Sequence, residues 1–163
     1  VRVVKNYIES TTPYAYNYIR FIAYGTQNYG WRAKKELSGG GIVLDLGYHL
    51  IGTVQDLFGN ISSVKAEYGQ SRIKYSSYET EDYASLLIKH DSGITGTITF
   101  GAMTGHKTEE LSILSPDTFI RLENTFRKDR PCGNWTVLAE TVLAETYLRK
   151  LLHILDRMRG SRV

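Results

Sequence analysis

The sequence has one cysteine, Cys132, together with three prolines and two methionines among its 163 residues. A single cysteine excludes an intrachain disulfide and a C-x-x-C metal motif, and a free thiol is typical of a reducing compartment. No apolar run approaches the roughly 20 residues that a helix needs to cross a bilayer. We therefore expect a cytoplasmic protein with no membrane partner.

The sequence also lacks a strong charge of either sign, because 20 basic residues face 17 acidic ones and the net charge is +3. Nucleic-acid binding requires a dense basic patch, so we do not expect a nucleic-acid partner, even on a tyrosine-rich sheet. The length suits a single domain over residues 1–163. Because the chain starts at Val1 in what already has the pattern of a helix, we expect a fragment of a longer two-domain protein.

The hydrophobic pattern predicts an α+β fold with a largely antiparallel, open-faced sheet and helices packed on one face. Alternating apolar and polar residues joined by short turns favour antiparallel strands. With 12 tyrosines in the chain, we expect an apolar, amphipathic surface on the other sheet face, and hence a homo-oligomer formed through it. The predicted helices are residues 1–10, 40–58 and 134–158, and the predicted strands are 14–24, 61–68, 83–90, 94–100, 107–114 and 119–123.

The most informative stretch is the predicted helix that follows the glycine run at 39–41. Asp45 and His49 are four residues apart and therefore share one face of this helix, opposite an apolar arc that packs into the core. A carboxylate can orient an imidazole and stabilise its protonated form, which suits removal of a proton from a hydroxyl group. The spacing alone is equally compatible with Asp45 and His49 being a partly exposed pair with a structural role and no catalytic one.

Other chemistries find less support. A glycine run before a helix can bind phosphate, but no G-x-G-x-x-G or G-K-[ST] motif is present, so a tight turn that brings the helix close to the sheet is the simpler interpretation. Asp45 and His49 could supply two metal ligands, but no third is visible and no metal is expected. No nucleophile motif of the G-x-S-x-G type occurs.

Two segments carry a family resemblance. Trp31-Arg32 followed by SGGGIVLDLGYHLI at residues 38–51 resembles the W-R, G-G-G, D-x-G-x-H pattern in the C-terminal domain of the Gfo/Idh/MocA family of oxidoreductases. Glu81-Asp82-Tyr83-Ala84 and the hairpin at residues 91–96 resemble that family's E-D-x-A strand and glycine hairpin. The resemblance covers about residues 1–125.

The resemblance implies the substrate-binding half of an oxidoreductase that uses NAD or NADP, with the cofactor held mainly by a Rossmann domain outside this chain. Asp45 would orient His49, and His49 would accept the proton from a sugar, polyol or related small molecule. Trp31, Arg32, His106 and Lys107 are candidate substrate contacts. By itself, the chain should neither bind cofactor well nor turn over.

One departure from the family pattern is Gly52, where many relatives carry an acidic residue, so the substrate contacts there are in doubt. A second function also remains open, namely a non-catalytic module for dimerisation or for binding a sugar-like ligand. The presence of both Asp45 and His49 favours the enzyme.

Overall fold

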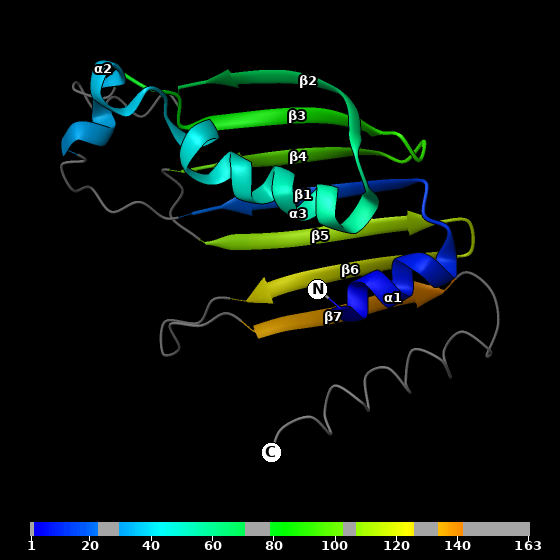
Figure 1. Ribbon diagram of the computed structural model, residues 1–163. Coiled ribbons are helices and arrows are strands. Elements are labelled where there is room, and N and C mark those ends of the chain that lie inside the picture. The colour runs from blue at the N-terminus through cyan, green and yellow to red at the C-terminus, as the bar shows by residue number, and fades with distance from the viewer. Residues whose placement is uncertain (1, 23–29, 71–78, 103–106, 126–133, 142–163) are drawn as a thin grey trace.

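The computed structural model describes residues 2–22, 30–70, 79–102, 107–125 and 134–141 (Figure 1). Helices and short helical turns occur in the first 58 residues, and strands make up most of the rest. The helical elements are α1 Arg2–Thr11, the 3₁₀ turn η1 Gly30–Ala33, α2 Lys35–Ser38, the π-helix η2 Val43–Gly47 and α3 Tyr48–Phe58. The strands are β1 Ala15–Phe21, β2 Ile61–Gly69, β3 Tyr83–His90, β4 Thr95–Gly101, β5 Thr108–Ser115, β6 Thr118–Thr125 and β7 Asn134–Thr141.

The strands form one seven-stranded sheet in the order β2-β3-β4-β1-β5-β6-β7. Only the β1–β4 pair is parallel, and every other neighbouring pair is antiparallel. Helices α1 and α3 lie on the same face of this sheet (Figure 1). The predicted α+β class, with helices on one face of a largely antiparallel sheet, is confirmed. Because β1 and β4 run in the same direction, their C-terminal ends lie side by side, at the end of the strands where α3 begins (Figure 1).

The core lies between α3 and the middle of the sheet. Burial alternates along β3 and β4, as expected for strands with one covered face. Leu50 and Val54 of α3 are fully buried against this face, as are Ile98 and Phe100 of β4. The apolar arc predicted for the helix is thus what attaches it to the sheet.

A buried aromatic cluster fixes the far end of α3. The Tyr16 ring stacks on Phe58 with centroids 4.4 Å apart, and its hydroxyl lies 3.1 Å from Nε2 of His90. Nδ1 of His90 lies 2.8 Å from the carbonyl oxygen of Gly59, which can only accept, so Nδ1 donates and Nε2 accepts from the tyrosine. Gly96 leaves the space for Tyr16, since a Cβ there would lie 2.2 Å from its ring. His90 therefore has a structural role.

Two buried tyrosines predict a loss of stability at alkaline pH. Burial raises the pKa of Tyr16 and of Tyr18 well above the ordinary value of 10.0. Above about pH 10 the unfolded chain loses these protons while the folded chain keeps them, so the free energy of unfolding should fall by about 1.4 kcal/mol per pH unit for each tyrosine. Urea unfolding from roughly pH 8 to about pH 11 should show a shallower decline for Tyr16→Phe than for the wild type. Parallel declines would contradict this assignment.

The prediction of a C-terminal helix over residues 134–158 is wrong where the structure describes it. Asn134–Thr141 forms β7, which pairs antiparallel with β6 from Thr125↔Asn134 to Thr118↔Thr141. The segment contains β-branched residues, and the unpaired backbone groups along β6 favour a further strand over the intrinsic helix propensity of the segment. The remainder of the predicted helix lies outside the described residues.

The open face of the sheet is more polar than predicted. Tyr16 and Tyr18 are buried on the helix-covered face, and the open face carries hydroxyl and charged side chains. Thr97 Oγ1 donates to Asn17 Oδ1 at 2.7 Å there. A shallow hollow on this face is lined by Lys65, Glu67, Ser85, Leu87, Thr97 and Thr99, among others. The expected apolar tyrosine surface is therefore wrong, although Tyr83 and Leu87 leave some apolar area exposed.

Candidate functional site

The glycine run makes a tight turn against Glu81, which lies just before strand β3. The chain leaves α2 through Gly39, whose φ of 74° is in the left-handed region that glycine tolerates best. Gly41 then lies against the backbone of Glu81, where an added Cβ would be 2.0 Å from the carbonyl oxygen. The amide of Ile42 donates to the same carbonyl at 2.9 Å. Glycine is thus needed here for close approach of the helix start to the sheet, as the tight-turn interpretation predicts.

The side chain of Glu81 completes this attachment. Its Oε1 accepts the amide N–H groups of Gly41 at 2.8 Å and of Val43 at 3.3 Å. Together with the carbonyl of Glu81, it satisfies the first N–H groups of the helix, which have no partner within the helix itself. The phosphate-binding interpretation of the glycine run is not supported, because these donors are already engaged. The sequence suggested no such role for Glu81, which is 40 residues away and becomes a neighbour only in the folded sheet.

Replacing Glu81 by alanine should destabilise the domain by about 1–3 kcal/mol, because two part-buried N–H groups lose their acceptor. The change is measured by urea unfolding. Glu79→Ala is the control, since Glu79 is an exposed acid on the same connection whose removal should leave the midpoint nearly unchanged. Equal effects of the two substitutions would show that Glu81 is only a surface charge.

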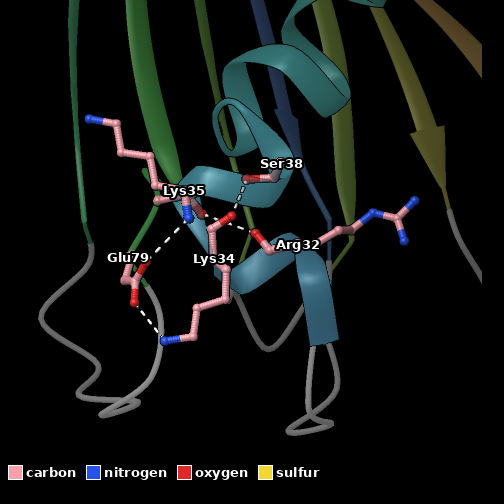
Figure 2. Close-up of polar contacts among 6 residues, drawn as sticks. Arg32, Lys34, Lys35, Ser38 and Glu79 are labelled. Atoms are coloured by element: carbon pink, nitrogen blue, oxygen red, sulfur yellow. Dashed lines mark hydrogen bonds and ion pairs between the residues drawn. The ribbon is translucent and has the colours of Figure 1, made fainter.

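Figure 2 shows the segment that precedes the glycine turn. Glu79 accepts from Lys34 Nζ at 2.6 Å and from the amide of Lys35 at 3.3 Å, and the hydrogen bond from Lys34 lowers the pKa of Glu79. The guanidinium of Arg32 points away from this pair (Figure 2). It lies instead over the ring of Trp31, with 4.7 Å between Cζ and the ring centroid. Trp31 and Arg32 are both exposed, so they offer a flat aromatic surface and a cation to a ligand.

Asp45 and His49 lie where the π-helix η2 passes into α3. Both side chains are exposed, whereas Leu46 and Gly47 between them are buried. Gly47 fixes the depth of the helix, because a Cβ there would lie 2.8 Å from the ring of Phe100 in β4. π-helical turns are rare and are frequent at functional sites. The helix expected over 40–58 is observed as η2 and α3, from Val43 to Phe58, and its first part is π-helical, which the hydrophobic pattern did not indicate.

The exposed face of α3 that carries His49 and Asp56 is turned toward α1. Asp56, seven residues after His49 and so on nearly the same side of the helix, accepts from Lys5 of α1 at 2.6 Å. The ring of His49 lies beside that of Tyr48, with centroids 3.8 Å apart. The imidazole is therefore neither buried in hydrocarbon nor covered, and it lies on the helix-covered side of the sheet.

Of the two further substrate contacts predicted from the sequence, the structure describes only one. Lys107 is exposed directly before β5, whereas His106 lies outside the described residues. Within the described ranges, no group of three or more His, Cys, Asp or Glu residues could hold a metal ion. Over the same part of the chain, no helix is long and apolar enough to cross a membrane.

The profile of the GFO/IDH/MocA C-terminal domain family matches residues 9–118. The chain belongs to this family, and the resemblance seen in the sequence is confirmed. No curated protein is significantly similar to it.

Solved structures share the fold at low sequence identity. Levoglucosan dehydrogenase in complex with NADH and levoglucosan is 16% identical with a TM-score of 0.64, over 83% of this chain and 43% of that chain. The NAD binding oxidoreductase from Klebsiella pneumoniae is 19% identical with a TM-score of 0.66, over 84% and 43%. The WlbA dehydrogenase from Chromobacterium violaceum, in complex with NADH and UDP-GlcNAcA, is 19% identical with a TM-score of 0.66, over 94% and 44%. The chain thus corresponds to less than half the length of these proteins.

Proposed function

We propose that this chain is the substrate-binding and catalytic half of a two-domain NAD(P)-dependent oxidoreductase that acts on a hydroxyl or carbonyl group of a sugar, polyol or related small molecule. The observation that carries the proposal is the pair Asp45 and His49, exposed on the edge of a helix that Glu81 and Gly47 attach to the sheet. Membership of the family and the NADH complexes among its structural neighbours support the reaction type.

In the proposed reaction, His49 accepts the proton of a substrate hydroxyl while the hydride passes to the nicotinamide, and Asp45 orients and stabilises the imidazolium. Exposed rings and cations elsewhere in the chain are proposed to supply binding energy. Trp31 offers a face on which a sugar ring can stack, and Arg32 and Lys107 offer donors to its hydroxyl groups. His106 remains a proposed contact from the sequence alone.

The cofactor, NAD or NADP, would be held mainly by a Rossmann domain joined to this one. The amides at the start of the helix do not offer a pyrophosphate site, because Glu81 engages them. This chain would then contribute to cofactor use by placing the substrate, not by binding the dinucleotide. We propose a cytoplasmic, homo-oligomeric enzyme whose subunits meet through the open face of the sheet.

The alternative is a non-catalytic module for dimerisation or for binding a sugar-like ligand. The mixed polar and apolar open face, with Tyr83 and Leu87 exposed, favours a contact surface and is compatible with either function.

The two functions are separated by a panel of sugars and polyols tested on the complete two-domain protein with NAD⁺ and with NADP⁺. If the protein is an enzyme, at least one polyol should give reduced nicotinamide, and the Asp45→Asn, His49→Ala double variant should lose that activity. Binding of a polyol without any reduction of cofactor would instead support the binding module.

A further inference from the structure

Strand β2 forms one edge of the sheet. It pairs with β3 on one side, and no strand among the described residues pairs with its other side (Figure 1). Every residue from Ser62 to Tyr68 is exposed. A long exposed edge, with a row of unpaired backbone N–H and C=O groups, is a template for pairing with another chain. The edge of β2 is therefore a candidate contact surface.

The helix-covered face of β2 carries exposed apolar side chains. Val64 is 47% exposed and Tyr68 is 66% exposed, although their partners in β3, Ile88 and Ala84, are fully buried. The cover over this face of the sheet thus ends at β3. A further strand beside β2 would bring side chains into contact with Val64 and Tyr68, because residues directly opposite each other on neighbouring strands pack together.

The open face of β2 carries one charge of each sign. Lys65 and Glu67 are two residues apart on the strand and therefore share a face, opposite to that of Val64 and Tyr68. No ion pair joins either charge to another side chain within the described residues. A lysine in the middle of an edge strand usually opposes pairing. Here a partner strand with a glutamate at the matching position would neutralise it.

We propose that β2 pairs antiparallel with β2 of a second copy of this chain, with Ala66 at the two-fold axis. The axis is perpendicular to the sheet, so the helix-covered faces of both copies lie on the same side. In this register Lys65 lies opposite Glu67 of the partner subunit, and Val64 lies opposite Tyr68 of the partner subunit. By symmetry each pair occurs twice, and the two sheets join into one.

The charges select this register over its neighbours. Side chains alternate between the faces, so the register can shift only in steps that keep the faces matched. One shift places Lys65 opposite Lys65 of the partner subunit, and the opposite shift places Glu67 opposite Glu67 of the partner subunit. Like charges directly opposite each other destabilise a strand pair, whereas opposite charges and an aromatic ring beside a β-branched residue stabilise it. The strand is thus complementary to itself, which favours a second copy over an unrelated strand.

This contact differs from the open-face contact proposed above. Pairing at the edge leaves the open face of each sheet uncovered, and it involves none of the residues assigned to catalysis. Its test therefore does not depend on whether the protein turns over a polyol.

Ala66→Cys tests the register in the full chain carrying Cys132→Ser. Residue 66 would lie opposite itself across the axis with about 4.5–5.5 Å between Cα atoms, which a disulfide can span. We expect mild oxidation to convert most of the chain into a covalent dimer on a non-reducing gel. Val64→Cys is the matched control, because it is exposed on the same face but its two copies would be four residues apart, roughly 13 Å, too far for a disulfide.

The charges are tested by the initial rate of disulfide formation in the Ala66→Cys chain. Lys65→Glu should lower this rate about 10-fold or more at the same protein concentration, because two attractive pairs become repulsive. The double variant Lys65→Glu, Glu67→Lys should restore the rate, since opposite charges again face each other. Lys89→Glu is the control for the change in net charge, because Lys89 is exposed on β3 and lies away from the edge.

The possible results separate the edge contact from other forms of association. A covalent dimer with Ala66→Cys alone, weakened by Lys65→Glu and restored by the double variant, supports the proposal. No covalent dimer, or equal yields from Ala66→Cys and Val64→Cys, overturns it. A dimer in sedimentation without the Ala66→Cys disulfide would show association elsewhere, such as through the open face, and would also overturn it. A rate that falls equally with Lys65→Glu and Lys89→Glu would overturn the register.

Discussion

Replacing His49 by alanine in the proposed two-domain enzyme is expected to lower the rate of hydride transfer by about 10²- to 10⁴-fold, the usual contribution of a general base. The affinity for NAD(P) should stay within about twofold, because the proposed function has the imidazole contact the substrate and has another domain hold the dinucleotide. Single-turnover formation of reduced nicotinamide measures the rate, and a cofactor titration measures the affinity.

Two controls distinguish a chemical role of His49 from a structural one. Gln55→Ala removes an exposed polar side chain farther along α3 and should leave the rate unchanged. Added imidazole should partly restore the rate of His49→Ala, since a small base can enter the space that the side chain leaves. A proportional loss of cofactor binding, or an unchanged rate, would rule out the assigned role.

Replacing Gly41 by alanine is expected to have the largest effect on stability. The new Cβ would lie 2.0 Å from the carbonyl oxygen of Glu81, so the helix start must move away from the sheet. Overpacking costs about 1–3 kcal/mol and sometimes more, and the movement would also lengthen the hydrogen bonds to the Glu81 carboxylate. Urea unfolding of the chain should show a clearly lower midpoint.

Gly52→Ala is the matched control, because Gly52 lies within α3 and an added Cβ there meets nothing within 4 Å. An alanine in a helix interior is more stable than glycine by about 0.5–1 kcal/mol, so this variant should unfold at higher urea. Opposite shifts for the two glycines would show that Gly41 is required for close approach. Similar shifts would mean that the turn simply relaxes.

The hydrophobic pattern predicted the sheet well where one face is buried. The alternation at 83–90 predicted β3 with its observed bounds, and the apolar arc predicted a helix ending at Phe58. It failed at Asn134–Thr141, because the segment has mixed propensity and its structure is decided by the free edge of β6. The hydrophobic periodicity of a segment indicates which of its residues are buried. It does not indicate which strand, distant in sequence, the segment will pair with.

The site was predictable to a similar extent. The spacing of Asp45 and His49 predicted that both side chains are exposed, and the role that the motif resemblance implies for them stays a proposal. The contacts that hold them in position were not visible, because Glu81, just before β3, and Phe100, in β4, are far away in sequence from the helix start.

The proposed role of His49 is tested most directly by a structure of the proposed two-domain enzyme with NAD(P)⁺ and a bound polyol. We expect a ring nitrogen of His49 to lie about 2.6–3.2 Å from the hydroxyl whose carbon faces the nicotinamide, with Asp45 beside the imidazole. A polyol bound over the nicotinamide with its reacting hydroxyl held by another side chain, and with His49 turned toward solvent, would contradict it.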